Sequence, residues 1–270
     1  MEDLRNKTAI ITGGASGIGR ATALALSKAG SRTVIADIDD EGAAAVAHEI
    51  EAAGGESIGV CCDVGVDSAF TELAEAALKR FGRVDIVMNN VGVMTSGRPE
   101  ELPLEEWQRV FNTNFMSVVR SNLVFLPLLM AQGSGHIVNT GSFAGLYTYA
   151  YDRLPYSSAK AAVIHLSEGL ALYLRPKGIG VTCLCPGPVK TNIVRSLKSF
   201  STGLEMRGPG RQFPLLSADA VGEMVVGAIK RNQLLLVTDD RVHEILVRRA
   251  QDPEALLEEQ IHAPHIIVLS

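Results

Sequence analysis

Short apolar segments rich in β-branched residues alternate with longer segments of helical periodicity along most of the chain. The short segments predict β-strands and the longer ones predict helices. Their alternation is typical of βαβ units on a parallel sheet, and strands this uniformly apolar are covered by helices on both faces. We therefore expect an α/β fold with a doubly wound parallel sheet of about seven strands, at Thr8 to Ile11, Thr33 to Ala36, Ile58 to Cys62, Ile86 to Asn89, His136 to Thr140, Gly180 to Cys185 and Leu234 to Thr238.

The chain has no internal repeat, low-complexity tract or charged linker, so its 270 residues are expected to form a single domain. An irregular stretch rich in Gly and Ser interrupts the strand and helix alternation from Ser196 to Phe213. Because long loops in compact domains are commonly functional, we predict a substrate lid at about 191–215. Asp239-Asp240 opens a further helix and another follows Pro253, which predicts a C-terminal helical extension at about 239–270.

Composition and charge favour a globular protein that binds a small molecule. The chain is 47% hydrophobic and 20% charged, which is enough apolar material for one large core. The formal charge of −5 and the scattered Lys and Arg residues argue against a nucleic-acid partner. No apolar run approaches the roughly 20 residues of a membrane span, and the start of the chain lacks the apolar region of a signal peptide. We therefore expect a cytoplasmic protein with no membrane partner.

The four cysteines, Cys61, Cys62, Cys183 and Cys185, fall within predicted strands, where a free thiol behaves as a small apolar side chain. An adjacent pair and a C-x-C do not have the spacing of zinc sites or of C-x-x-C redox motifs. The six histidines show no paired ligand spacing either. We therefore predict buried cysteines, no disulfide and no metal.

A glycine-rich turn joins the first predicted strand to the first predicted helix. Thr12 to Gly19 reads T-G-G-A-S-G-I-G, and the helical pattern follows from Arg20. Glycine allows a tight turn and the close approach of a pyrophosphate, whose charge is favoured by the N–H groups of a helix N-terminus. Since such turns also simply reverse the chain, this turn alone does not establish dinucleotide binding.

The second predicted strand ends at Asp37, 18 residues after Gly19, where a carboxylate can accept hydrogen bonds from the adenosine ribose hydroxyls. The same charge would repel the 2′-phosphate of NADP, and Ile38 is not the Arg or Lys expected of an NADP site. The sequence therefore favours NAD over NADP. The alternative is that Asp37 merely begins a turn with Asp39 and Asp40.

The spacing T-G-x-x-x-G-I-G, together with Y-x-x-x-K at Tyr156 and Lys160, resembles the motifs of the short-chain dehydrogenase/reductase family. The resemblance covers roughly residues 5–238 and implies a single Rossmann-type domain, a nicotinamide cofactor and oxidoreductase activity. It implies cofactor contacts at the glycine turn, after several strands and at the Tyr–Lys pair. The expected cofactor-binding residues are Gly13, Ser16, Ile18, Gly19, Asp37, Ile38, Asp63, Val64, Asn90, Gly92, Tyr156, Lys160, Pro186, Gly187, Val189 and Thr191.

Tyr156 and Lys160 are four residues apart, so on a helix they share one face. A close ammonium favours phenolate and brings tyrosine toward useful acid/base strength, although Y-x-x-x-K also occurs by chance on solvated helices. The family resemblance requires two further residues, and both occur in the required order: Asn114, and Ser142 just past the fifth predicted strand.

The resemblance also assigns roles to these four expected catalytic residues. It implies that Tyr156 exchanges a proton with the substrate while Ser142 binds the substrate oxygen. Lys160 would lower the pKa of Tyr156 and hold the nicotinamide ribose, and Asn114 would fix a water that relays protons from Lys160. The implied reaction interconverts an alcohol and a ketone.

Tyr149 and Tyr151 are rival phenols in the same segment, but the residues four positions later are Arg153 and Pro155 rather than Lys. The residues expected to surround the substrate are apolar or aromatic, which favours a secondary alcohol or ketone with a bulky aromatic, alicyclic or steroid-like body. These expected substrate residues are Met94, Phe143, Leu146, Tyr149 and Leu154.

Two other functions stay open on the sequence alone: a non-catalytic dinucleotide-sensing protein, and a related enzyme acting on a sugar, polyol or enoyl substrate. Sensing requires no proton donor, so the complete set of Ser142, Tyr156 and Lys160 argues against the first. The place of Ser142 in the loop after the fifth strand favours a simple carbonyl over the second. The resemblance further implies a homodimer or homotetramer, with the helix containing Trp107 and the helix containing Tyr156 at a subunit interface.

Overall fold

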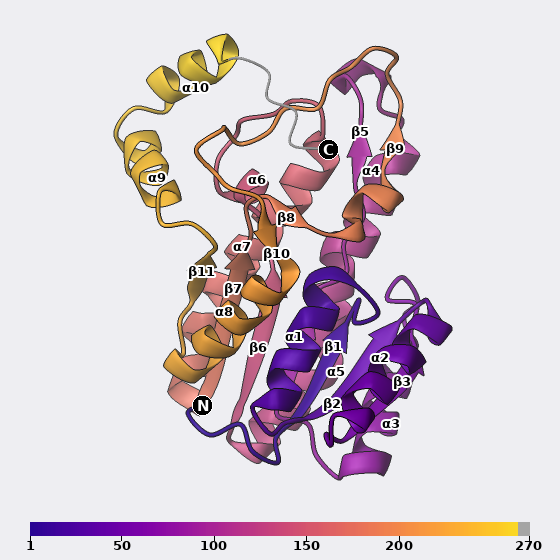
Figure 1. Cartoon of the computed structure of the whole chain (residues 1–270). Helices are drawn as coiled ribbons and strands as arrows, with labels where there is room; N and C mark the ends of the chain where they lie inside the picture. The colour runs from indigo at the N-terminus through magenta and orange to yellow at the C-terminus, as the bar shows by residue number, and fades with distance from the viewer. Residues whose placement is uncertain (264–270) are drawn as a thin grey trace.

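A parallel β-sheet runs through the middle of the molecule between two layers of helices (Figure 1). The computed structural model describes residues 1–263 of the chain. Seven strands form the sheet, and no predicted strand boundary differs from the observed one by more than one residue. The strands are β1 (Thr8–Thr12), β2 (Arg32–Asp37), β3 (Ser57–Cys61), β4 (Ile86–Asn89), β6 (Gly135–Thr140), β7 (Ile179–Cys185) and β11 (Leu235–Val237).

The strand order is β11-β7-β6-β4-β1-β2-β3, and all neighbouring strands are parallel. The chain winds from β1 toward one edge and from β4 toward the other, which confirms the doubly wound sheet. Connections from β1 and β4 therefore leave in opposite directions and open a crevice at the carboxyl ends of these two strands, where open α/β sheets bind ligands.

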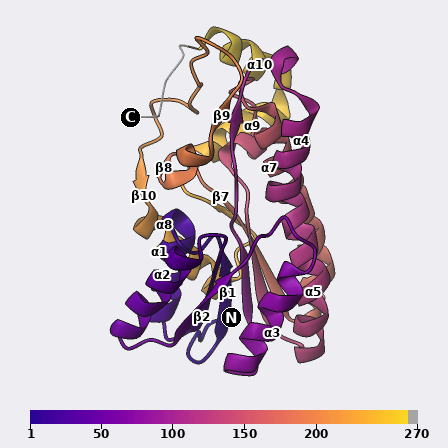
Figure 2. The ribbon, with the colours of Figure 1, turned by 90° about the vertical axis from the view of Figure 1, so that its right-hand side faces the viewer.

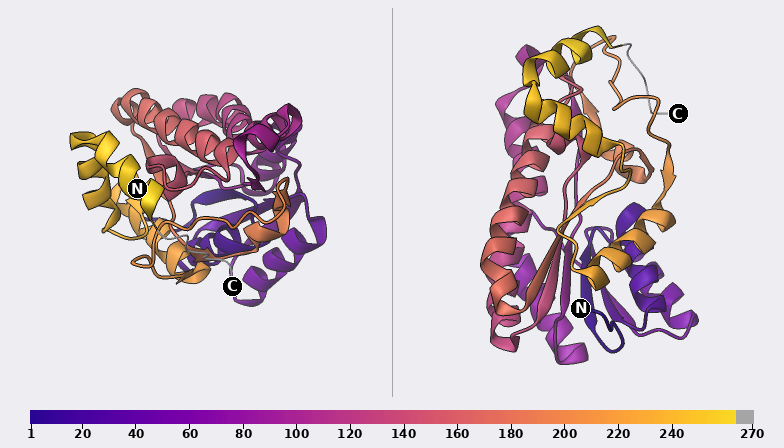
Figure 3. Two further views of the ribbon diagram at one scale, coloured as in Figure 1. Left: turned by 90° about the horizontal axis from the view of Figure 1, so that it is seen from above. Right: turned by 90° about the vertical axis from the view of Figure 1, so that its left-hand side faces the viewer.

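Helices cover both faces of the sheet, as Figure 2 and the view from above in Figure 3 show. On one face lie α1 (Gly17–Lys28), α2 (Asp40–Ala52) and α8 (Ala218–Arg231). On the other lie α3 (Ala69–Phe81), α5 (Ser117–Gln132) and α7 (Leu154–Leu174). Each layer has its own apolar core against the sheet, one around Ile11 and Leu26 and one around Val87 and Phe125, because the strands are apolar on both sides.

The helix Leu104–Gln132 consists of α4 (Leu104–Phe111), a π-helical turn η2 (Asn112–Met116) and α5, and a window of it has a mean hydropathy of 1.4. Among the described residues it is the one helix long and apolar enough to span a membrane by these criteria. It contains no unbroken apolar run, because Arg120 and several amides and hydroxyls interrupt the sequence. In the fold it packs against α3 and α7, and Arg120 pairs with Asp67.

Several short elements and two terminal helices lie at the end of the molecule where the crevice opens (Figures 1 and 3). The predicted helical extension contains two helices, and its apolar residues 266–269 lie outside the described part of the chain. These elements are β5 (Thr95–Ser96), η1 (Pro99–Glu101), α6 (Phe143–Leu146), β8 (Val189–Lys190), η4 (Asn192–Ser196), β9 (Lys198–Ser199), β10 (Leu216–Ser217), α9 (Val242–Gln251) and α10 (Pro253–His262). The short η3 (Arg175–Lys177) lies at the opposite end, between the end of α7 and the start of β7.

All four cysteines are free, but they are not all buried. Cys62, Cys183 and Cys185 are buried as predicted, whereas Cys61 is exposed. The prediction for Cys61 is wrong because β3 is the edge strand of the sheet, and alternate residues of an edge strand face the solvent rather than a helix.

Candidate active site

A cavity of 510 Å3 occupies the crevice at the carboxyl ends of the strands. The glycine turn after β1 and the residues after β2 and β3 line one part of it, and the loop after β4 and the segment 191–215 line another. Between them lie Ser142, Tyr156 and Lys160. The cavity thus brings together segments that are far apart in the sequence.

The glycine turn and the start of α1 are shaped to receive a phosphate group. Gly13 and Gly17 have φ values of 65° and 52°, in the left-handed region that favours glycine. A Cβ on Gly19 would lie 2.1 Å from the carbonyl oxygen of Gly13, so only glycine lets the helix approach the turn. The N-cap residue Ser16 makes no side-chain capping bond, and no acidic residue occupies the first turn of α1. The N–H groups there can therefore bind an anion.

Asp37 lies at the end of β2 with its carboxylate fixed by the backbone. Its Oδ2 accepts a hydrogen bond from the N–H of Ala15 at 3.0 Å, and its Oδ1 accepts one from the N–H of Asp39 at 3.1 Å. Asp37, the exposed Ile38 and Asp63 all line the cavity. The charge in this part of the cavity suits ribose hydroxyls and disfavours an additional phosphate.

Fifteen of the sixteen residues expected to bind cofactor line the cavity, the exception being Gly19. Gly19 is buried behind the turn, where its missing side chain permits the close packing just described. Asn90 supports the turn from the loop after β4, since its Nδ2 donates to the carbonyl oxygen of Thr12 at 3.3 Å. The residues present therefore fit a dinucleotide along this wall.

Tyr156 and Lys160 lie in the first two turns of α7 and both are buried. The Nζ of Lys160 lies 5.7 Å from the centre of the Tyr156 ring and donates a hydrogen bond to the carbonyl oxygen of Thr140 at 2.7 Å. Burial lowers the pKa of Lys160 from 10.5 to about 8. Lys160 is thus a fixed cation beside Tyr156 at neutral pH, with a proton that is more easily released than that of an exposed lysine.

Ser142 follows β6 and caps the short helix α6, where its Oγ accepts a hydrogen bond from the N–H of Ala144 at 3.2 Å. Burial raises the pKa of Tyr156, while a hydrogen bond from Ser142 and the charge of Arg153 lower it. Arg153 is thus a cation that lowers the Tyr156 pKa, and the sequence did not single it out for this effect. Without a ligand the phenol keeps its proton at neutral pH.

Asn114 does not line the cavity, although it was expected to fix a water there. It lies in the π-helical turn η2 and is buried. Its Oδ1 accepts a hydrogen bond from the N–H of Val93 at 2.8 Å, and its Nδ2 donates to the carbonyl oxygen of Val93 at 2.9 Å. Both ends of the amide are therefore engaged in holding the loop after β4.

Two of the five expected substrate residues, Met94 and Tyr149, line the cavity, whereas Phe143, Leu146 and Leu154 do not. Phe143 points into the core because α6 turns it against Phe213, with ring centres 5.1 Å apart. Other loop residues line the cavity instead, and most of them lie within the predicted lid at 191–215. They include Val93, Arg153, Ile193, Met206, Arg207, Pro209 and Leu215.

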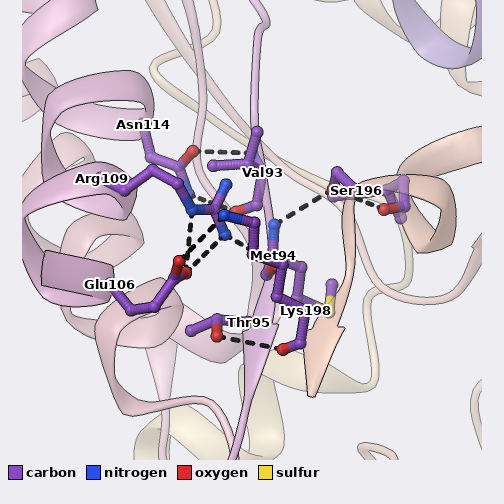
Figure 4. A network of polar contacts seen from close by, with 9 residues as sticks. Val93, Met94, Thr95, Glu106, Arg109, Asn114, Ser196 and Lys198 are labelled. Atoms are coloured by element: carbon purple, nitrogen blue, oxygen red, sulfur yellow. Dashed lines mark hydrogen bonds and ion pairs between the residues drawn. The ribbon is translucent and has the colours of Figure 1, made fainter. Parts of the chain in front are cut away.

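Polar contacts fix one end of the predicted lid to the loop after β4 and to α4 (Figure 4). The buried Glu106 accepts hydrogen bonds from Nε of Arg109 at 2.8 Å and from Nζ of Lys198 at 3.2 Å. Burial raises the pKa of the Glu106 carboxyl. Arg109 and Lys198 together lower this pKa by more than burial raises it, so that it lies below its ordinary value. Ser196 accepts a hydrogen bond from the N–H of Met94 at 3.2 Å, and β9 pairs with β5. Met94 is thereby held between the lid and the sheet.

The place of Arg153 in the cavity was not predicted. In the sequence Arg153 stands four positions after Tyr149, where a lysine would have been needed for a second Tyr–Lys pair. The available signal was the adjacent charged pair Asp152-Arg153, three positions before Tyr156, in a segment that is otherwise aromatic and apolar. In the structure it is 8% exposed and pairs with the buried Asp152.

The parallel sheet, the phosphate-binding turn and the Ser142, Tyr156 and Lys160 cluster define a Rossmann-type oxidoreductase fold. The family model for short chain dehydrogenases matches residues 7–201. The chain belongs to the short-chain dehydrogenase/reductase family. Proteins of this family use nicotinamide dinucleotides and act on small-molecule substrates.

The chain is similar to one protein of known structure and to two named proteins, and these matches cover different shares of its length. A short chain dehydrogenase/reductase from Burkholderia phymatum in complex with NAD has a TM-score of 0.84 and 31% identity, and the match covers all of both chains. Cyclohexanol dehydrogenase of Acinetobacter sp. (strain SE19) is 36% identical over 190 residues, 70% of this chain and 75% of that protein. Probable oxidoreductase EphD of Mycobacterium tuberculosis is 36% identical over 233 residues, and the match covers 83% of this chain but only 39% of EphD.

Proposed function

We propose that this protein is an NAD(H)-dependent oxidoreductase that interconverts a secondary alcohol and a ketone, with Tyr156 as the general acid and base. The observation that carries the proposal is the placement of Ser142, Tyr156 and Lys160 together in one cavity whose other wall fits a dinucleotide. Cyclohexanol dehydrogenase, a relative by sequence, is named for a substrate of this class.

NAD is the proposed cofactor in preference to NADP. Gly13, Ser16 and Ile18 would hold the pyrophosphate, and the fixed carboxylate of Asp37 would accept hydrogen bonds from the adenosine ribose. Lys160 would bind the nicotinamide ribose, and Thr191 and Val189 would close the cavity around the nicotinamide. When bound, NAD accepts hydride from the alcohol, or NADH supplies it to the ketone.

Tyr156 would exchange the proton with the substrate oxygen, and the hydroxyl of Ser142 would stabilise the charge that develops on that oxygen. Ketone reduction needs the protonated phenol, which burial favours because it raises the Tyr156 pKa. Alcohol oxidation needs the deprotonated form. We therefore expect oxidation to accelerate as pH rises above neutrality, while reduction is fastest near neutral pH.

Met94, Tyr149, Ile193, Met206 and Leu215 would form the walls around the substrate. These side chains are apolar or aromatic, which supports a substrate with a bulky alicyclic or aromatic body over a sugar or polyol. Binding of such a body would remove apolar surface from water and bring the carbinol carbon to Tyr156.

We further propose that the protein forms a homodimer or homotetramer in the cytoplasm. Leu123 of α5 and Leu172 of α7 are 73% and 82% exposed, which is unusual for large apolar residues on neighbouring helices and suits a subunit interface. The four free cysteines suit a reducing compartment.

The test is a panel of cyclic, aromatic and steroid alcohols, with sorbitol as the polyol, assayed with NAD and with NADP by absorbance of the reduced nicotinamide. We expect NAD reduction with at least one bulky secondary alcohol. Tyr156→Phe removes only the acid/base hydroxyl, so turnover should fall by orders of magnitude while NADH binding, measured by fluorescence, is unchanged.

Each outcome discriminates between the candidate functions. Full turnover in Tyr156→Phe would refute the acid/base assignment. NADH binding without turnover of any alcohol or ketone would favour a dinucleotide sensor, and preference for sorbitol or NADP would contradict the proposed substrate class or cofactor.

A further inference from the structure

Asp152 and Arg153 form an ion pair immediately before α7, and Arg153 occupies the N-cap position of that helix. Both side chains are buried, Asp152 completely and Arg153 with 8% of its surface exposed. The Nε of Arg153 donates to Oδ1 of Asp152 at 2.6 Å. Buried charges need partners in good geometry, and here each charge is the partner of the other.

The same two side chains bind both sides of one residue in the lid. Oδ2 of Asp152 accepts a hydrogen bond from the N–H of Arg207 at 2.7 Å, and Nη2 of Arg153 donates to the carbonyl oxygen of Arg207. The carbonyl oxygen of Asp152 also accepts a hydrogen bond from the N–H of Gly97 at 2.9 Å. The start of the catalytic helix is thereby tied to two loops at the mouth of the cavity.

This attachment lies where the lid lines the cavity, since Met206 to Pro209 are all lining residues. It is separate from the attachment through Glu106 and Lys198 at the other end of the lid. Arg207 in turn donates to the carbonyl oxygen of Gln260 at 3.0 Å, which extends the connection to the C-terminal end of α10. The lid is thus held between the catalytic helix and the terminal helices.

Arg153 also places a positive charge beside the acid/base tyrosine. It lies three residues before Tyr156 and lines the same cavity, and its guanidinium carbon is 5.9 Å from the centre of the Tyr149 ring. The charge of Arg153 lowers the Tyr156 pKa and opposes the effect of burial. The titratable or charged groups around Tyr156 are Arg153 with its partner Asp152, Lys160 on α7, Tyr149 in the preceding loop and Cys185 on β7.

We propose that Arg153 is a positioning residue with two roles, which rest on the proposed function: it holds the lid over the substrate through the backbone of Arg207, and it keeps a fixed positive charge beside Tyr156. Arginine can perform both roles because its planar group donates to Asp152 and to Arg207 at the same time. Lysine would supply the charge but not the paired hydrogen bonds. This difference allows the two roles to be separated.

The test compares Arg153→Gln, Arg153→Lys and the control Arg211→Gln, which changes an exposed residue of the same lid. In Arg153→Gln, amide hydrogen exchange in residues 196–213 should accelerate at least tenfold, and the KM for the alcohol should rise about tenfold. Loss of a nearby cation should also move the pH midpoint of alcohol oxidation upward, because the Arg153 charge lowers the Tyr156 pKa. NADH affinity and the melting temperature check that the fold and the cofactor site persist.

In Arg153→Lys we expect faster exchange and a raised KM, but the wild-type pH midpoint. Arg211→Gln should behave as wild type in all three measurements. Unchanged lid exchange in Arg153→Gln would overturn the first role, and an unchanged pH midpoint in that variant would overturn the second. If the wild type oxidises no alcohol, the proposed function and the charge role fail together, whereas hydrogen exchange still decides whether Arg153 holds the lid.

Discussion

Replacement of Lys160 by methionine should make the protein without cofactor more stable at neutral pH. A pKa lowered from 10.5 to about 8 corresponds to about 3 kcal/mol of unfavourable free energy for the charged lysine in the folded state. Methionine has a similar length and no charge, but it leaves the carbonyl oxygen of Thr140 without its donor, at a cost of about 2 kcal/mol. The expected net gain at pH 7 is therefore about 1 kcal/mol.

The sign of this difference should change with pH. Below pH 8 both folded and unfolded wild-type protein carry the proton, so the full penalty is present. Between pH 8 and 10.5 the folded state releases the proton first, and wild-type stability rises by about 3 kcal/mol relative to Lys160→Met. At pH 10.5 the wild type should therefore be the more stable protein.

Urea unfolding of both proteins at intervals from pH 7 to 10.5, without cofactor, measures this difference directly. Titrating groups distant from Lys160 contribute equally to both proteins and cancel in the comparison. The Lys160 charge lowers the pKa values of Cys183 and Cys185, so these two thiols add a smaller difference of their own. The two stability curves should cross above pH 8. A variant that is less stable than wild type at pH 7 by an amount that does not change with pH would refute the reasoning.

Two further predictions concern the glycine turn and the subunit interface. Gly19→Ala places a methyl group 2.1 Å from the Gly13 carbonyl oxygen and should weaken NADH binding more than tenfold, as measured by fluorescence titration. The control is Gly169→Ala, at an open position in α7. It should leave NADH binding unchanged and stabilise the fold by about 1 kcal/mol. Equal NADH affinity in both variants would contradict the role of the turn. Leu172→Glu on the exposed face of α7 should lower the mass measured by light scattering toward that of a monomer, whereas an unchanged oligomer would place the interface elsewhere.

The sheet could be predicted almost residue by residue because each strand is a short apolar run between turn signals. β4 and β6 are covered by helices on both faces, so their continuous apolar pattern and their composition both predict a buried strand. Cys61 is the exception, because a position on an edge strand depends on the strand order, which the local pattern does not contain. Short fixed motifs likewise identified the glycine turn, Ser142 and Tyr156.

The substrate part of the cavity could not be predicted in the same way. Its residues come from loops whose course depends on tertiary contacts, such as the bonds from Asp152 and Arg153 to Arg207. Phe143 looked like a wall residue by its place next to Ser142, but α6 turns it into the core. Asn114 was expected in the cavity, yet its amide binds the Val93 backbone at both ends. Phe213 and the backbone of Val93, which hold these two side chains, are distant from them in the sequence, so the local pattern does not contain the contacts.

The way the lid is attached has a consequence for how such a protein diverges. Segment 191–215 is joined to its surroundings by hydrogen bonds to loops and helix residues, by the short strand pair β5–β9 and by the aromatic contact of Phe213, while the sheet and its two apolar cores lie elsewhere. Substitutions in the lid that keep these few attachments would alter the fit of the substrate at little cost in stability. The dinucleotide wall depends on glycines and backbone packing in the core and has no such freedom. Selection for a new substrate can therefore act on one loop while the cofactor wall stays unchanged.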